Sequence, residues 1–442
     1  MTKILKLSLI LILIFQILIA SGFELAHDEA YYWLYSRHLD WGYFDHPPAV
    51  GLIIRLFSFL PHSEVSVRLG FILLQIVAAI LLIREVPKNR QFTALILFFA
   101  FPLASFGGLL ALPDLPLLFM TTVFCVLLKR YLEKGDDFSV YGLTAAIPLL
   151  LYSKYHGILV VFFTIVAVPS LLQRKSFWLI AAGSVAIFWN HVLWQYKHDF
   201  STLRYHFLER PKSEFDLKRL FEYTMTQIFL AGLFVGPVVW WITLKIKTQT
   251  QFERALKFIS IGTVVFFFIS TFSKKFEANW TIFLAAPLIL LTIKSALWDK
   301  KWIKVSLGVS FGIVMLARIL FVFEPETIKI RRLSEFHGWK NWAQMVNEKC
   351  DGPIMANSYQ IASKLSFYLN RPIHALNFNS RKNQFDYWLH DETYYLTPEV
   401  CYVTDKKKEF PGELILTPDG KKLHVVKDFK PSSLSVKVRD VQ

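Results

Sequence analysis

Apolar runs long enough to approach a membrane span recur along the chain, and they limit its fold more than any other feature. Examples are residues 4–20, 71–83, 92–112 and 303–323. An α-helix needs about 20 residues to cross roughly 30 Å of hydrocarbon. Of the 442 residues, 54% are hydrophobic, whereas soluble domains contain about 45–50% apolar residues. The sequence therefore predicts a polytopic α-helical membrane protein.

Basic residues lie mainly in the short loops between apolar runs. The positive-inside rule places such loops in the cytoplasm and accounts for the net charge of +15, so no nucleic-acid partner is expected. With Lys3 and Lys6 inside, about eleven spans follow. They are residues 4–20, 65–83, 92–109, 115–128, 140–151, 158–172, 177–194, 227–243, 258–272, 281–293 and 305–323. A cleaved signal peptide ending near Ser21 is the alternative for the first run.

The character of the chain changes after the last run. Residues 334–350 and 359–370 have helical periodicity, and residues 401–405, 413–417 and 421–429 are typical of strands. We therefore expect a transmembrane domain over 1–323 and a small soluble α/β domain over 324–442, both belonging to a multi-pass membrane protein.

With eleven spans, the soluble domain lies in the periplasm. In an oxidising compartment Cys350 and Cys401 could pair, although spacing alone does not establish a disulfide. Cys125 falls inside an apolar run, where packing is the simpler explanation.

Six separate segments bring ionisable side chains to the predicted outer face. Ionisable groups near the membrane interior are costly, so they are candidates for function. The candidate residues are Asp28, Glu29, Asp45, His46, Asp114, Lys154, Arg210, Lys274 and Lys275.

These residue types suit group transfer from an anionic lipid. Lysine and arginine can bind a phosphate and stabilise the charge that develops on it as it leaves. A carboxylate such as Asp28 can accept the proton of an acceptor hydroxyl. The combination predicts glycosyl transfer with a lipid-phosphate leaving group. Glu29 and Asp114 would support the base or hold a metal, and the residues that face the phosphate would be His46, Lys154, Arg210, Lys274 and Lys275.

Each candidate also has a structural explanation. Asp28 could cap the helix that follows it. Asp45 and His46 could form a turn before a helix beginning at Pro47, and Asp114 could simply mark a helix end. The Tyr and Trp residues between positions 31 and 43 are interpreted as an aromatic belt at the membrane interface.

A divalent metal held by Asp45 and His46 is left open, because no tight metal-binding spacing such as HExxH occurs. The chain has no glycine-rich phosphate-binding loop. We therefore expect no nucleotide cofactor.

Several motifs resemble those of one enzyme group. The stretch "DEAYYWLYSRHLDWGYFDHPPAVGLII" is similar to the first external loop of bacterial integral-membrane glycosyltransferases of the GT-C type. These are relatives of protein O-mannosyltransferases and of lipid A aminoarabinose and galacturonic acid transferases. "LPDLPLLF", "SKYHGIL" and "EANW" resemble later motifs in the same order. "YQIASKLSFYL" and "NSRKNQFDYW" resemble the C-terminal domain of one bacterial branch.

The resemblance implies a polyprenyl- or dolichyl-phosphate sugar donor and inverting transfer on the outer face, by a multi-pass protein of the bacterial inner membrane. The acidic residue that the family carries after its first span falls on Asp28, with Glu29 beside it, within a catalytic loop over 23–64. The second acidic position falls on Asp114. Many relatives have a lysine where this chain has His46, and relatives can bind a divalent metal near the matching loop.

The predicted function is transfer of a sugar from a polyprenyl-phosphate donor to an envelope acceptor on the periplasmic face. The acceptor can be lipid A, another glycan or a protein, and the sugar is left open. A transporter or a flippase for lipid-linked sugars is the alternative, which would favour internal repeats and charged residues at the membrane midplane. A non-catalytic assembly or polysaccharide-binding protein is a third class.

Overall fold

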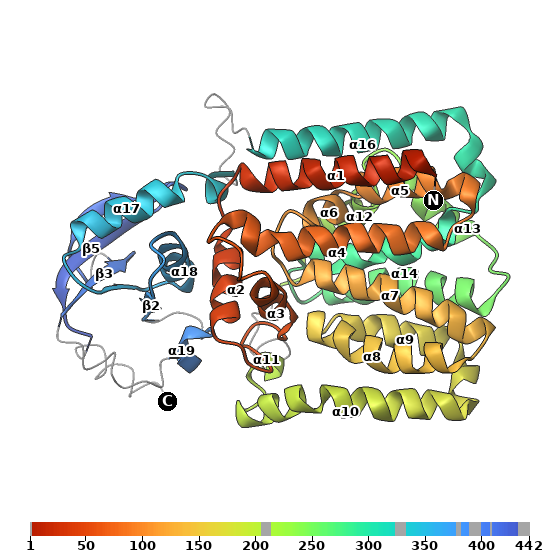
Figure 1. Ribbon diagram of the computed structural model, residues 1–442, viewed down its shortest axis with the longest axis horizontal. Coiled ribbons are helices and arrows are strands. Elements are labelled where there is room, and N and C mark those ends of the chain that lie inside the picture. Colours follow the sequence, from red (N-terminus) through yellow and green to blue (C-terminus); the bar gives the residue numbers. More distant parts are fainter. Residues whose placement is uncertain are drawn as a thin grey trace.

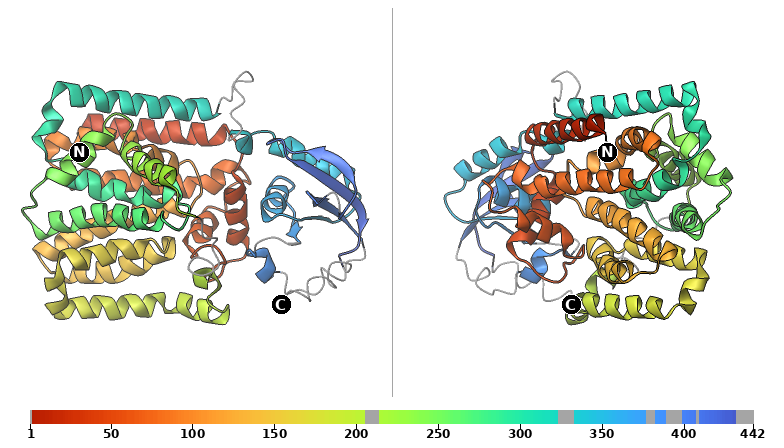
Figure 2. Two further views of the ribbon diagram at one scale, coloured as in Figure 1. Left: turned by 180° about the vertical axis from the view of Figure 1, so that it is seen from behind. Right: turned by 45° about the vertical axis from the view of Figure 1, so that its right-hand side comes forward.

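The computed structural model describes residues 2–204, 214–322, 333–376, 382–388, 399–406 and 409–431. It has two parts (Figure 1). One is a bundle of long helices that run roughly alongside one another, and the other is a C-terminal sheet with helices packed on it. Helices α2 (His27–Arg37) and α3 (Ala49–Leu56) lie between these two parts, as the view from behind in Figure 2 also shows.

Among the described residues, five helices are long and apolar enough to cross a membrane. They are α1 (Lys3–Ser21), α4 (Glu64–Arg84), α7 (Asp114–Glu133), α10 (Lys175–Lys197) and α16 (Lys301–Val322). Each coincides with one predicted span. Their length and hydrophobicity support a membrane protein, while the total of eleven spans stays a prediction.

The other predicted spans coincide with helices that are shorter or interrupted, or, in the case of α14 (Gln251–Ser270), that carry the charged residues Glu253, Arg254 and Lys257 in the first two turns. The regular ones are α8 (Asp137–Ser153), α9 (Gly157–Ala167) with the 3-10 turn Pro169–Gln173, and α14. Three are broken in two: α5 (Gln91–Ala100) with α6 (Pro102–Gly107), α12 (Leu217–Leu230) with α13 (Gly236–Lys245), and the 3-10 helix Ala278–Leu284 with α15 (Ala285–Thr292). Short turns complete the bundle at Lys88–Arg90, Ala296–Asp299 and α11 (Ser201–Arg204).

Two of these breaks have local causes. Pro102 starts α6, because a proline has no N–H to continue the preceding helix. Gly232 has a φ of +112°, which a residue with a side chain rarely adopts, and it separates α12 from α13. Both breaks leave backbone groups to be satisfied by neighbouring helices.

The aromatic residues of the predicted first external loop pack inside the protein. Tyr31, Tyr32, Tyr35 and Tyr43 are all buried, and the rings of Tyr35 and Tyr43 stack with centroids 3.8 Å apart. The interpretation of these residues as an interfacial belt is therefore wrong, although Trp41 is 52% exposed. Their pairing with one another fixes α2 against the loop that follows it.

The C-terminal part contains a five-stranded sheet in the order β2-β1-β3-β5-β4. Its strands are β1 (Ile354–Ala356), β2 (His374–Ala375), β3 (Val400–Thr404), β4 (Glu413–Leu416) and β5 (Lys422–Phe429). β1 pairs in parallel with β2 and β3, whereas β5 runs antiparallel to both β3 and β4. The three predicted strands coincide with β3, β4 and β5. β1 and β2 are too short to show an alternating pattern.

Helices α17 (Trp339–Lys349), α18 (Tyr359–Tyr368) and α19 (Phe385–Trp388), with the turn Leu333–Phe336, accompany the sheet. The first two coincide with the predicted helices. A disulfide joins Cys350 at the end of α17 to Cys401 in β3. The predicted boundary between residues 323 and 324 lies outside the described residues, so the division into domains stays a prediction.

Candidate active site

A cavity of about 710 Å³ lies where α2 meets the ends of the bundle helices. Its walls come from α2 and the following loop, the start of α7, the turn between α8 and α9, the end of α14 with the loop behind it, and the start of α18. Six predicted site residues line it: Asp28, Asp45, His46, Asp114, Lys154 and Lys274. Residues from five distant stretches of sequence therefore meet at one place.

Two adjacent carboxylates on α2 have opposite environments. Asp28 is exposed and lines the cavity, whereas Glu29 is fully buried and does not line it. The backbone N–H of Ala26 donates to Glu29 Oε2 at 2.9 Å, so Glu29 satisfies the helix start that Asp28 was expected to cap. Asp28 is thereby left to face the cavity.

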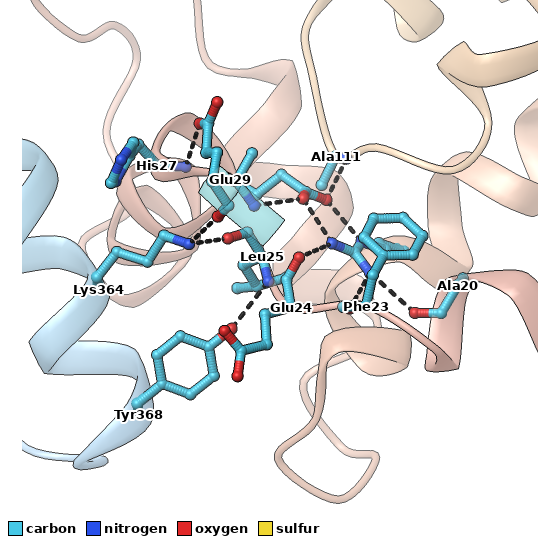
Figure 3. Close-up of polar contacts among 12 residues, drawn as sticks. Ala20, Phe23, Glu24, Leu25, His27, Glu29, Ala111, Lys364 and Tyr368 are labelled. Atoms are coloured by element: carbon cyan, nitrogen blue, oxygen red, sulfur yellow. Dashed lines mark hydrogen bonds and ion pairs between the residues drawn. The ribbon is translucent and has the colours of Figure 1, made fainter. Parts of the chain in front are cut away.

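Glu29 forms a buried ion pair with Arg68 of α4. Arg68 donates from Nε and Nη2 to the two carboxylate oxygens at 2.8 and 2.7 Å, and both side chains are fully buried. The other guanidinium N–H groups donate to the carbonyls of Ala20, Phe23 and Glu24. Such a network anchors the chain between α1 and α2, because an unpaired charge there would be very costly. Figure 3 shows Glu29 together with Ala20, Phe23 and Glu24, the residues to which Arg68 is hydrogen-bonded.

Asp114 and Lys154 form a second buried pair at the wall of the cavity. Lys154 Nζ lies 2.7 Å from Asp114 Oδ1, and Asn279 Nδ2 donates to Oδ2 at 3.0 Å. Asp114 starts α7 instead of ending a helix, and both members of the pair are 5% exposed. A lysine ammonium has three N–H donors, so Lys154 can bind Asp114 and also face a ligand in the cavity.

Asp45 is held by a hydrogen-bond chain that begins in the C-terminal part. The backbone N–H of Gln384 donates to the Tyr31 hydroxyl, which donates to Asp45 Oδ2 at 2.9 Å. The Gln384 side-chain oxygen accepts from the N–H of Phe44 at 2.7 Å. His46, the next residue, lies with its ring edge-on to Tyr32.

The remaining cationic residues predicted to bind the phosphate are Lys274, Lys275 and Arg210. Lys274 is partly buried and lines the cavity, whereas Lys275 is exposed and does not line it. Arg210 lies outside the described residues.

The tyrosines of the cavity wall are neutral hydrogen-bonding groups. Burial raises the pKa of Tyr32 well above its ordinary value, and the nearby charge of Asp28 raises it further. Burial likewise raises the pKa of Tyr31. Both phenols therefore stay protonated at physiological pH and cannot act as bases there.

The described residues give limited support to a metal site. They contain no group of three or more His, Cys, Asp or Glu side chains that could hold an ion. Asp45 already accepts a hydrogen bond from Tyr31, and Glu29 is occupied by Arg68. A metal held by Asp45 and His46 stays a prediction, and the mechanism below uses only side chains of the protein.

Sequence reasoning missed several residues of the site. Arg68 is an ionisable residue inside an apolar run, a signal that could have identified it. The sequence prediction places Tyr31 and Tyr32 at the membrane interface, and it includes Asn279 only as part of the motif "EANW". Tyr359 lines the cavity from α18, and nothing in the local sequence indicates that position.

Comparisons with known proteins agree with this architecture. Residues 45–194 match the model of the family described as dolichyl-phosphate-mannose-protein mannosyltransferase. The lipid A galacturonosyltransferase RgtD of Rhizobium johnstonii is 23% identical over 312 residues, which are 66% of this chain and 64% of that protein. The match thus spans a little under two thirds of that relative.

Two crystal structures of ArnT from Cupriavidus metallidurans share the fold at 13% identity. The apo structure has a TM-score of 0.71, and the structure bound to undecaprenyl phosphate has a TM-score of 0.70. The alignments cover 96% of this chain and 98% of each ArnT chain. Part of the sequence and the overall fold support the predicted resemblance: the chain is a multi-pass membrane protein that is similar to glycosyltransferases of the GT-C type.

Proposed function

We propose that the protein transfers a sugar from a polyprenyl-phosphate donor to an envelope acceptor, with inversion at the anomeric carbon and Asp28 as the base. Lipid A is the acceptor class favoured by the similarity to RgtD, which is named as a lipid A galacturonosyltransferase. The similarity to an ArnT structure that holds undecaprenyl phosphate supports the donor class.

One observation carries the proposal. An exposed carboxylate, Asp28, and the cationic groups of Lys154 and Lys274 line a single cavity beside the ends of apolar helices. A base and a phosphate-binding group are the two functions that sugar transfer from a lipid phosphate requires. Asp114 and Asn279 keep Lys154 in place from behind.

The reaction follows from these positions. An acceptor hydroxyl oxygen attacks the anomeric carbon from the face opposite the phosphate and loses its proton to the Asp28 carboxylate. The bond between the anomeric carbon and the phosphate oxygen breaks, and both bonding electrons leave with the polyprenyl phosphate. Lys154 and Lys274 stabilise the charge gained by the phosphate, and Asp28 then releases its proton to water.

The apolar side of the cavity suits a lipid substrate. Ile158 at the start of α9 and Phe266 near the end of α14 line the cavity and are about half exposed, at 51% and 48%. Side chains that are apolar and exposed at the end of a membrane helix can contact lipid chains. A polyprenyl tail could therefore reach the cavity without leaving the membrane.

The periplasmic face is the proposed location of the cavity. The Cys350–Cys401 disulfide lies in the C-terminal part, and Tyr359 of that part lines the cavity. Disulfides persist in oxidising compartments such as the bacterial periplasm.

The test of function uses purified protein in vesicles with radiolabelled polyprenyl-phosphate sugars. Release of free polyprenyl phosphate supports the transferase. Movement of intact donor across the vesicle membrane, without release, would instead show a flippase, and an inert donor would favour a binding protein. Mass spectrometry of envelope glycolipids with and without the protein identifies the acceptor.

Asp28→Asn tests the base. Its amide cannot accept the proton, so transfer should fall roughly 10²- to 10⁴-fold, measured as kcat for release of polyprenyl phosphate. The matched control is Asp137→Asn, the same change at an exposed carboxylate at the start of α8. Turnover of Asp28→Asn within a factor of three of the control would remove Asp28 from the mechanism.

A further inference from the structure

The C-terminal helices hold the chain segment that leads into α2. This segment, residues 22–26, joins α1 to α2 and ends two residues before Asp28. Figure 3 shows Lys364 and Tyr368 of α18 directed at Leu25 from the side opposite the bundle. α18 packs along α2, so the contacts belong to a larger interface.

Both backbone polar groups of Leu25 are bound by α18. The Leu25 N–H donates to the Tyr368 hydroxyl at 2.8 Å, and Lys364 Nζ donates to the Leu25 carbonyl. Lys364 also donates to the carbonyl of Glu335 at 2.8 Å and is 1% exposed. Lysine is rarely buried so completely unless it is paired, so a specific role has to offset the cost of burying its charge.

Two carboxylates complete the junction by capping helices across it. Glu335 accepts a hydrogen bond from the N–H of His27, the first residue of α2, at 2.9 Å. Glu24 accepts from the N–H groups of Trp339 and Lys340, the first residues of α17, at 2.5 and 3.1 Å. Each side therefore satisfies N–H groups at a helix start on the other side. The register of α2 against the C-terminal part is fixed by these bonds.

We propose that Lys364 is a positioning residue for Asp28: by holding the backbone of Leu25, with Tyr368, it sets the angle at which α2 presents Asp28 to the cavity. This inference rests on the proposed function, in which Asp28 is the base. It assigns the C-terminal part a role in the chemistry of the membrane part.

The geometry supports positioning over general stability in two ways. Leu25 lies three residues before Asp28 and two residues before the start of α2, so a backbone shift there moves the start of the helix that carries the carboxylate. Tyr359, at the other end of α18, lines the same cavity, with its ring 4.7 Å from that of Tyr31. A displacement of about 1 Å at a reacting group can lower a rate roughly 100-fold.

The test compares kcat and KM of three single variants, each normalised to folded monodisperse protein. Lys364→Met keeps the length of the side chain and removes its N–H donors, and Tyr368→Phe removes only the hydroxyl. Both should lower kcat roughly 10- to 100-fold and change KM for the donor less than threefold. Lys422→Met, at an exposed lysine of β5, should change neither constant.

A double variant separates positioning from any other effect. If Lys364 acts through Asp28, adding Lys364→Met to Asp28→Asn should cause no further loss of kcat, because there is no base left to position. A full additional loss in the double variant would overturn the inference, as would wild-type kcat in the two single variants. Should Lys364→Met fail to fold, Tyr368→Phe and its double variant with Asp28→Asn decide the question.

These outcomes are distinguishable from failure of the proposed function. If Asp28→Asn alone keeps turnover, the assignment of the base is wrong and the positioning role falls with it. If Asp28→Asn is inactive while Lys364→Met and Tyr368→Phe are fully active, the proposed function stands and only the positioning role is overturned.

Discussion

Asp28 and Glu29 show how one residue step on a helix separates two functions. Successive side chains on an α-helix point about 100° apart, and here the two adjacent carboxylates point to different surroundings. Glu29 points to Arg68 and to the N–H of Ala111, which donates to Oε1 at 2.8 Å, and Asp28 points to the cavity. The buried carboxylate supports the exposed one.

Glu29→Gln should destabilise the protein, whereas Asp28→Asn should not. The glutamine leaves the Arg68 charge buried without its partner, a change that costs about 3–5 kcal/mol. The measurement is the thermal unfolding midpoint in detergent, where Glu29→Gln should unfold several degrees below wild type. Equal midpoints for the two variants would show that the Glu29–Arg68 pair does not stabilise this junction.

At the scale of elements, α2, α17 and α18 depend on one another at their ends. Lys364 lies at their meeting point, where the charges of Glu335, Glu24, Glu29 and Arg68 all act on it. Burial lowers the pKa of Lys364 to about 7, against 10.5 in its ordinary state, although the three carboxylates oppose this shift. Below about pH 7 the folded protein therefore contains a charged, buried lysine, and burial of this charge lowers the stability of the fold.

The stability of the protein should increase as the pH rises from about 7 to 10.5. In that range the unfolded chain binds a proton at Lys364 that the folded protein has released, so deprotonation favours folding by on the order of a few kcal/mol. Unfolding midpoints at pH 7, 8 and 9 should rise in wild type and in Lys422→Met. In Lys364→Met this part of the increase of the unfolding midpoint with pH should be absent. An unchanged increase would contradict the assignment of the pH dependence to Lys364.

At the scale of the whole molecule, the cavity needs both parts of the chain. Its walls extend from Asp28 to Tyr359, and the chain between Tyr31 and Asp45 is tied to Gln384. The disulfide links the end of α17 to the sheet by joining Cys350 to Cys401, which are 51 positions apart in the sequence. Stability of the C-terminal part should thus affect the site.

Replacing both cysteines, as in Cys350→Ser with Cys401→Ser, should lower stability by about 2–4 kcal/mol, because the unfolded chain gains freedom. A lower unfolding midpoint checks this. Reductant should lower the midpoint of the wild type toward that of the variant and leave the variant itself unchanged. An effect of reductant on the variant would assign the change to another cause.

The local sequence determined the elements of this protein. Apolar runs give helices wherever they occur, because backbone groups in hydrocarbon must pair within the segment. The stretches 401–405 and 421–429, whose residues are typical of strands, coincide with β3 and β5. The order of the predicted spans places Asp28, Asp45 and Asp114 on the same side of the membrane. The structure brings these three residues to one cavity.

Only the tertiary structure decided which charges face that cavity. Glu29 and Arg68 are 39 positions apart, and Asp114 and Lys154 are 40 apart. Lys364 lies 339 positions from Leu25, whose carbonyl it binds. The spacing of apolar residues in the sequence indicates whether one segment forms a helix or a strand. It does not indicate which side chains on different elements are in contact. The pairing of buried charges is set by packing, and packing left Asp28 exposed in the cavity.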